Sequence, residues 1–264
     1  MKLPPLALGA ALLGIACSDG TGLGNEPGVS LSFTTRTTAA QPAPGFFGSV
    51  MADTMVDDQQ NELIITSAQV VLREIELERM NHDDCDDMSG SDDSCEEIDV
   101  GPMLVDLPLN GGVETTITVD VPADVYDEIE FDIHKVSNDD PGDADFRAQY
   151  PDMVGKSIRV TGTFNGEAFT YETDLSVEQE YDLNPPLTVD ANSPSANVTV
   201  LFDLSGWFVD GSGNLIDPRT ANDGGANEGL VEENIKQSVE AFEDDDHDGH
   251  DDSDEFGDDS SDDS

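Results

Sequence analysis

Basic residues are scarce in this 264-residue chain: Lys and Arg together number 10, against 59 Asp and Glu, for a formal net charge of −49. Binding to nucleic acid requires Lys and Arg to neutralise phosphates, and anionic membrane surfaces attract polybasic segments. This composition therefore argues against both as partners of the folded part. Acidic groups at such density repel one another unless salt or bound cations screen them. We expect a saline environment, bound divalent cations, or both.

Long apolar segments are also missing, apart from Leu3 to Leu13, which follows the basic residue Lys2. This segment is shorter than the roughly 20 residues that a helix needs to cross a bilayer, so it predicts a processed signal peptide. It leads into Leu13-Gly14-Ile15-Ala16-Cys17, which resembles the lipobox of bacterial lipoproteins. The resemblance implies that residues 1–17 are a lipoprotein signal peptide and that Cys17 is lipidated. An ordinary secretory signal, in which Cys17 has no role, is the alternative.

The segment after this cysteine, residues 18–28, is polar and rich in Gly, as is typical of a flexible tether. By the same resemblance, Ser18 directly after the cysteine favours sorting to the outer membrane. We therefore expect a cell-envelope lipoprotein, held at the outer membrane or cell surface through a lipid anchor at Cys17. We expect no nucleic-acid partner, and the sequence does not indicate which protein or glycan the chain binds.

Cysteine is rare as well, with three in the chain. If Cys17 carries lipid, Cys85 and Cys95 remain as a pair on either side of a short acidic loop. A disulfide between them is the natural expectation in an oxidising compartment, worth somewhat under the ~3 kcal/mol estimated for a loop of about 15 residues. A zinc site formed by His82 and these two cysteines is the alternative.

Recognisable catalytic motifs are absent: the chain has no Gly-x-Ser-x-Gly elbow, phosphate-binding Gly loop or His-Glu-x-x-His helix. Carboxylate pairs are too numerous for any one pair to indicate a glycosidase. His134 is expected on the exposed face of a strand, and Trp207 is either a core aromatic, which we favour, or a platform for sugar stacking. We expect that the protein is not an enzyme. The alternative is a carbohydrate-active or other hydrolase with an unrecognised site.

Hydrophobic alternation with a period of two dominates residues 29–209, and short turn sequences separate the alternating segments. Asn165-Gly166 between two such segments predicts a tight hairpin, because both turn positions require a positive φ. Residues 74–78 fit a strand with a bulge at Arg73-Glu74 better than a helix. The pattern predicts an all-β fold, an antiparallel β-sandwich of immunoglobulin-like or prealbumin-like type.

Four short segments carry a resemblance to a known family. They are Ile65-Thr66-Ser67-Ala68-Gln69-Val70, Met103-Leu104-Val105-Asp106-Leu107, Val121-Pro122-Ala123-Asp124-Val125-Tyr126-Asp127-Glu128-Ile129 and Val198 to Asp203. In order and character they resemble a family of bacterial lipoproteins of unknown function with a β-sandwich domain, over about Ser30 to Asp203. The resemblance implies the sandwich fold and supplies no catalytic residue.

Residues 210–264 are expected to lie outside the sandwich domain. Residues 210–243 predict a loop and an amphipathic helix capped by Asn227, with one apolar stripe formed by Val231, Ile235, Val239 and Phe242. Residues 244–264 form an acidic tail that is too polar to fold alone and is expected to be disordered.

One motif in the acidic tail carries specific chemistry. Asp244-x-Asp246-x-Asp248-Gly249, with Glu255 as the twelfth residue, resembles the calcium loop of EF-hand proteins. Alternate carboxylates converge on a hard cation, glycine permits the sharp turn, and the last glutamate closes the site. The predicted calcium ligands are Asp244, Asp246, Asp248, His250 through its carbonyl, Asp252 and Glu255.

If calcium binds, we expect a weak affinity, on the order of 10⁻⁴ to 10⁻³ M as in extracellular modules. A solvated polyanionic tail and a transition-metal site using His247 and His250 are the alternatives. The leading hypothesis is a lipid-anchored, exported binding or structural module with a cation-responsive C-terminus.

Overall fold

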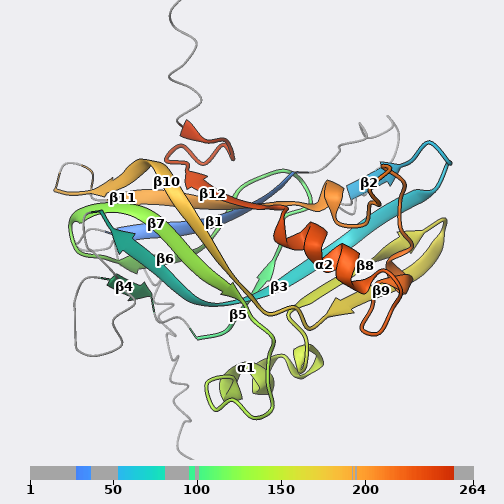
Figure 1. The fold of residues 1–264 in the computed structure, drawn as a ribbon. Helices are drawn as coiled ribbons and strands as arrows, with labels where there is room; N and C mark the ends of the chain where they lie inside the picture. Colours follow the sequence, from blue (N-terminus) through green and yellow to red (C-terminus); the bar gives the residue numbers. More distant parts are fainter. Residues whose placement is uncertain are drawn as a thin grey trace, which may run out of the picture.

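Two β-sheets make up most of the computed structural model, which describes residues 28–36, 53–80, 95–98, 101–191, 193 and 195–252 (Figure 1). The four-stranded sheet has the order β12-β11-β1-β6. Its strands are β1 (Gly28–Arg36), β6 (Glu114–Asp120), β11 (Ser195–Asp203) and β12 (Val239–Glu243). Apolar side chains from both sheets form one core cluster, which confirms the predicted all-β, sandwich-like fold.

The eight-stranded sheet has the central order β10-β7-β3-β8-β9, with β2, β4 and β5 also paired to β3. Its strands are β2 (Asp53–Val56), β3 (Glu62–Arg79), β4 (Cys95–Ile98), β5 (Met103–Asp106), β7 (Asp124–Ile133), β8 (Ile158–Phe164), β9 (Glu167–Thr173) and β10 (Val177–Val189). The helices are α1 (Ala144–Gln149), α2 (Glu228–Lys236) and the 3-10 turns η1 (Pro151–Met153), η2 (Leu204–Gly206) and η3 (Pro218–Thr220). None of the helices described is long and apolar enough to cross a membrane.

Two local predictions are confirmed. The predicted hairpin joins β8 to β9, with φ of 52° at Asn165 and 78° at Gly166. Residues 74–78 are part of β3, and the register between β3 and β7 shifts between Arg73 and Glu76, where Glu74 has a φ of 50°. The bulge lets β3 curve while it keeps its apolar side chains on the inner face.

One pairing departs from the predicted antiparallel arrangement. β1 and β11 lie side by side and run parallel, with Gly28 opposite Ser195 and Arg36 opposite Asp203. A parallel pair needs a long crossover connection, and here the whole eight-stranded sheet lies between the two strands in sequence. Local patterns carry no information on such a distant pairing.

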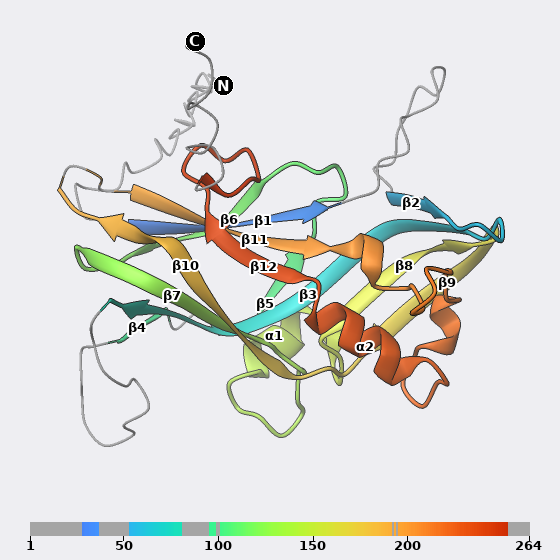
Figure 2. The same ribbon diagram turned by 45° about the horizontal axis from the view of Figure 1, so that its top comes forward.

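The predicted helix is shorter than its apolar stripe. α2 ends at Lys236, and Val239 and Phe242 belong to β12, where they lie opposite Phe202 and Thr199 of β11. β11 would otherwise leave its backbone groups unpaired at the sheet edge, and this pairing overrides the helical spacing. Figure 2 shows the chain running from α2 directly into β12 and then into the loop that follows it.

Candidate metal centre in the C-terminal loop

Asp244–Asp252 continues from β12 as an ordered loop, so the expected disorder is wrong for this part of the tail. The Asp244 amide donates to the Asn197 carbonyl of β11 at 3.1 Å and so extends the strand pairing by one residue. The Asn197 side-chain amide donates to the Asp244 carbonyl at 2.8 Å, and the Asn197 backbone amide donates to Asp245 Oδ1 at 3.2 Å. These bonds fix the start of the loop on the four-stranded sheet.

The Asp244 carboxylate organises the loop around itself. This side chain is completely buried. Its Oδ2 accepts hydrogen bonds from the Thr199 hydroxyl at 2.7 Å and the Gly249 amide at 3.2 Å, and its Oδ1 accepts one from the Asp248 amide at 2.9 Å. A buried carboxylate is tolerated when such donors replace the water that it has lost.

Gly249 is required at the sharp turn for two reasons. Its φ is 84°, a left-handed conformation that glycine adopts without steric cost. A Cβ at this position would also lie 3.1 Å from Cγ2 of Val113 and 3.5 Å from Oγ1 of Thr34, which is tight. The loop therefore lies against β1 and the residue just before β6 as well as against β11.

Three predicted ligands come together in this loop. Asp244, Asp246 and Asp248 each offer a carboxylate oxygen, and these oxygens lie within 4.8 Å of one another. Calcium–oxygen distances of 2.3–2.6 Å allow two ligands of one ion to be up to roughly 5 Å apart. The spacing therefore fits a hard cation of that size. The three side chains occupy the first, third and fifth positions of the motif, as the sequence predicts.

The ninth position also returns to the site, because Asp252 Oδ2 accepts a hydrogen bond from the Asp245 amide at 3.0 Å. Burial raises the pKa of Asp252, and the charges of Asp246, Asp244 and Asp245 raise it further. Burial together with Asp245, Asp252 and Asp251 raises the pKa of Glu243 to about 7. The local hydrogen bonds therefore do not fully offset the repulsion between the carboxylates of this loop.

The remaining predicted residues are placed as follows. His250 is exposed, and its amide donates to Asp248 Oδ1 at 2.8 Å. His247 is exposed, with Nδ1 3.1 Å from the Asp245 carbonyl. Glu255, Cys17, Cys85 and His82 lie outside the described residues, and Cys95 is described only as a backbone position in β4 opposite Glu78. The disulfide, the zinc alternative and the lipidation therefore stay predictions.

His134 corrects the sequence interpretation. It was expected on an exposed strand face, but its exposed fraction is 7%, and its Nε2 lies 2.9 Å from Oδ1 of the fully buried Asp143. Asp143 immediately precedes α1 in the turn that follows β7, and its other carboxylate oxygen accepts a hydrogen bond from the Ser137 amide. In the sequence, the turn signal after His134 was the only indication that the chain folds back toward this histidine.

Two further groups of potential ligands already contain a basic side chain. In the first, His134, Asp140 and Asp143 come together, and Arg73 Nη1 lies 2.7 Å from Asp140 Oδ2. In the second, which includes Asp174, Lys135 Nζ lies 2.5 Å from Asp174 Oδ2. The guanidinium of Arg73 at Asp140 and the ammonium of Lys135 at Asp174 supply positive charge that a metal would otherwise bring.

The outer face of the eight-stranded sheet carries rows of carboxylates that the sequence analysis missed. Strand register places Glu130 between Glu180 and Glu76, and it places Glu128 between Asp182 and Glu78. We call this set of residues the acidic rows. Directly opposed like charges destabilise a sheet. The alternating acids of each strand were visible in the sequence, but their alignment across strands was not.

Burial and neighbouring charges change the protonation of the acidic rows. Burial first, then the charges of Glu180, Glu78 and Asp182, raises the pKa of Glu128 to about 7; a hydrogen bond with Glu78 also contributes. Burial, followed by Glu178 and Glu76, raises the pKa of Glu130 to about 7. These carboxyl groups therefore titrate close to neutrality.

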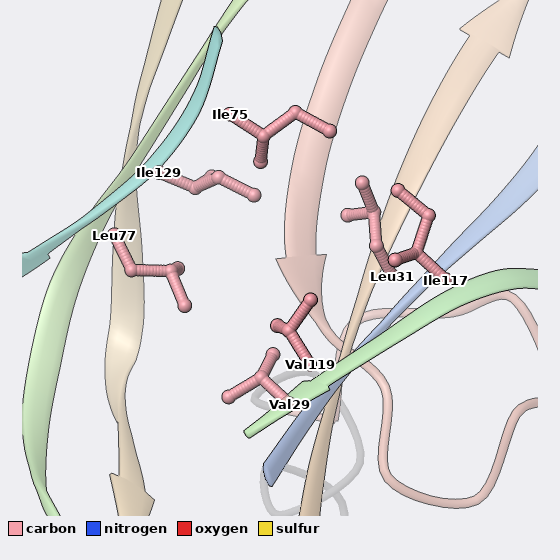
Figure 3. Close-up of a pocket in the computed structure, with 7 residues that line it drawn as sticks. All are labelled: Val29, Leu31, Ile75, Leu77, Ile117, Val119 and Ile129. Carbon is pink, nitrogen blue, oxygen red and sulfur yellow. The ribbon is translucent and has the colours of Figure 1, made fainter. Parts of the chain in front are cut away.

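Part of the space between the two sheets is apolar. A gap between them is lined only by aliphatic side chains: Val29, Leu31, Ile75, Leu77, Ile117, Val119 and Ile129 (Figure 3). Trp207 is completely buried and donates from Nε1 to Ser238 Oγ at 2.7 Å, which confirms the core interpretation over sugar stacking.

No family model matches this chain, and no curated protein matches it. Among solved structures, MbnP from Methylosinus trichosporium is similar at 12% sequence identity and a TM-score of 0.36, over 69% of this chain and 78% of that chain. The resemblance of residues 30–203 to a lipoprotein family stays a prediction.

Proposed function

We propose that this protein is an exported, lipid-tethered binding or structural module whose C-terminal loop binds calcium. The observation that carries the calcium part is the convergence of the Asp244, Asp246 and Asp248 carboxylates within 4.8 Å, around a turn that requires Gly249. The sequence motif selects these three residues, and the same three carboxylates converge in the structure, although the sequence placed them in a tail expected to be disordered. This convergence supports the proposal.

Calcium suits this donor set better than other common metals. The converging ligands are carboxylate oxygens, which bind hard cations, whereas zinc and copper sites draw on imidazole and thiolate. Neither His247 nor His250 belongs to the converging group. Magnesium demands near-ideal octahedral geometry and retains its water, so it should bind this loop more weakly than calcium.

The loop is also partly pre-organised for binding. Asp244 is held by three donors and by the extension of β12 along β11 before any ion arrives. Asp246 and Asp248 are exposed, and they project from the turn that Asp244 fixes. An ion then has to order a few side chains rather than a whole tail, which lowers the entropic cost of binding.

Export and tethering rest on the N-terminal sequence. The signal-like segment ending at Cys17 motivates the lipid anchor, and β1 begins at Gly28 after the Gly-rich residues 18–28. A module held in this way outside the cytoplasm would encounter the millimolar calcium that a weak loop requires. Labelling cells with radioactive palmitate tests the anchor: Cys17→Ser should abolish incorporation, and incorporation that survives it contradicts the lipid assignment.

Calorimetric titration of the full chain with calcium tests the metal site. Wild type should bind with a dissociation constant on the order of 10⁻⁴ to 10⁻³ M. Asp246→Asn removes one exposed ligand and should abolish saturable binding. Asp58→Asn, the same charge change at an exposed position in the turn after β2, should bind as wild type does. Heats that do not saturate, or that both variants share equally, contradict a specific site.

A further inference from the structure

Two Asn-Gly pairs occur in the chain, Asn110-Gly111 and Asn165-Gly166. Asparagine loses its side-chain amide readily in such a pair, because glycine has no side chain to hinder attack by its own backbone nitrogen. All four residues are exposed, so access to water does not distinguish the two pairs. The contacts of the two asparagine side chains do distinguish them.

The side chain of Asn165 is held by another segment of the chain. Its Oδ1 accepts a hydrogen bond from the Glu62 amide at 2.9 Å, and its Nδ2 donates to Asn61 Oδ1 at 3.0 Å. The Asn165 backbone amide also donates to the Glu62 carbonyl, at 2.8 Å. The side-chain amide is therefore fixed against the start of β3, and both of its hydrogen bonds must break before it can turn toward the nitrogen of Gly166.

The side chain of Asn110 is folded onto its own backbone instead. Its Oδ1 accepts a hydrogen bond from the Gly112 amide at 2.9 Å. A Cβ at Gly112 would lie 3.1 Å from this Oδ1 and 3.5 Å from both Cγ and Nδ2 of Asn110, so the whole amide group lies against the turn. Among the hydrogen bonds of the residues that the structure describes, none involves Nδ2 of Asn110.

This arrangement favours attack on the Asn110 amide by the backbone nitrogen of Gly111. The hydrogen bond from Gly112 stabilises the negative charge that develops on Oδ1 as the nitrogen bonds to Cγ. The folded side chain also keeps Cγ beside the backbone that carries the attacking nitrogen, which lowers the entropic cost of the reaction. The departing group, Nδ2, has no hydrogen bond to a described residue that would hold it back.

We propose that Asn110 is a site of spontaneous deamidation in the folded protein and that the fold protects Asn165. The Gly111 nitrogen forms a bond to Cγ of Asn110 and gives up its proton, while the bond from Cγ to Nδ2 breaks and Nδ2 leaves with that proton as ammonia. Water then opens the resulting succinimide ring at either carbonyl, which gives aspartate or isoaspartate at position 110.

The product changes the surface around this turn. Asn110 lines a groove of about 340 Å³ together with Asp106 and Glu114, so conversion adds a third carboxylate to the groove. Isoaspartate also inserts its side-chain methylene into the backbone of a turn that Thr34 Oγ1 ties to β1 by donating to the Gly112 carbonyl at 3.2 Å. The inference is independent of the proposed calcium binding.

Incubation of the full chain at pH 8, followed by mass spectrometry of its peptides, tests the inference. In the folded protein, Asn110 should convert at least about tenfold faster than Asn165, because two hydrogen bonds must first break at Asn165. In urea, where both sets of contacts are lost, the two pairs should convert at similar rates. Asn61→Ala removes one of the two bonds and should speed conversion at Asn165 severalfold, while the rate at Asn110 stays unchanged.

Three results would overturn the inference. The first is conversion of the two asparagines at equal rates in the folded protein. The second is conversion of Asn110 in urea but not in the folded protein, since the turn would then protect this side chain. The third is a rate at Asn165 that is low in the folded protein and unchanged by Asn61→Ala, which would show that its hydrogen bonds are not what protects it.

Discussion

The two outer faces of the sandwich carry different polar side chains. Over β1 and β11 of the four-stranded sheet they include the neutral residues Ser32, Thr34, Asn197 and Thr199, which are buried beside a loop with three converging carboxylates. On the eight-stranded sheet they are Glu and Asp in the acidic rows, spread over three strands. Convergent carboxylates in a turn form the donor set that the proposed ion requires, whereas charge spaced along strands at about 5 Å or more is relieved by protonation and salt. The same acidic composition therefore produces a convergent group of carboxylates in the loop and rows of mutually repelling carboxylates on the eight-stranded sheet.

The largest effect is expected at the centre of the loop. Asp244→Ala leaves the Thr199 hydroxyl and two loop amides without their acceptor, so the free energy of unfolding should fall by about 2–3 kcal/mol. Urea denaturation in calcium-free buffer measures it. Asp246→Ala removes the same charge from an exposed position and should change stability by less than about 0.5 kcal/mol. Equal losses from the two variants contradict the anchoring role of Asp244.

Gly249→Ala should have the next largest effect. The left-handed conformation costs an L residue about 1 kcal/mol, and the new Cβ would press on Val113. We expect a loss of about 1–2 kcal/mol in unfolding free energy and a several-fold weaker calcium affinity. Gly211→Ala, where a Cβ meets no atom within 4 Å, is the control and should bind calcium normally. Unchanged binding by Gly249→Ala would show that the turn does not set the site.

The acidic rows should make stability depend on pH in the opposite sense to ordinary ion-paired carboxylates. The pKa of Glu128 and Glu130 is raised from 4.5 to about 7 in the folded state. The folded protein therefore binds more protons between these values, and this contribution is present below about pH 4.5 and lost as the pH rises through about 7. Each group contributes about 1 kcal/mol, since partial exposure screens the interaction.

Urea denaturation across pH 5 to 8 measures this slope. Glu130→Gln should reduce the loss of stability as the pH rises, because the neutral amide no longer ionises between its charged neighbours. Glu114→Gln, at an exposed position on β6, should leave the slope unchanged. A wild-type stability that increases steadily over this range contradicts the assignment.

Salt should give the smallest effect and should separate the two faces. Raising NaCl from 0.1 to 1 M shortens the screening length from about 10 Å to about 3 Å. In calcium-saturated protein at pH 8, we expect the unfolding free energy to rise by about 0.5 kcal/mol through the acidic rows. Glu130→Gln should lose part of this gain, whereas Asp58→Asn, which should bind calcium as wild type does, should keep it. An undiminished gain in Glu130→Gln would place the salt-sensitive repulsion outside the acidic rows.

Local patterns were sufficient for the strands and their tight connections. Alternation predicted the sandwich, Asn165-Gly166 predicted the β8–β9 hairpin, and the broken alternation at Arg73-Glu74 predicted the bulge. Each depends on residues close together in sequence. The convergence of the Asp244, Asp246 and Asp248 carboxylates was predictable for the same reason, because one turn of chain brings them together.

Distant partners account for the errors. The end of α2 could not be predicted, because the need of β11 for a strand partner decided the conformation of residues 239–243. Order in the first part of the tail depends on Asn197 and Thr199, more than 40 residues earlier. The burial of His134 depends on where a loop delivers Asp143. The acidic rows depend on inter-strand register, which no single segment encodes.

We propose that an ion binds in the loop and not on the acidic rows. A crystal structure of the full chain grown with calcium, with anomalous data collected at long wavelength, tests this directly. We predict one strong anomalous peak within coordination distance of Asp244, Asp246 and Asp248. Absence of a peak there, or a peak between Glu130 and Glu180 instead, would contradict the account.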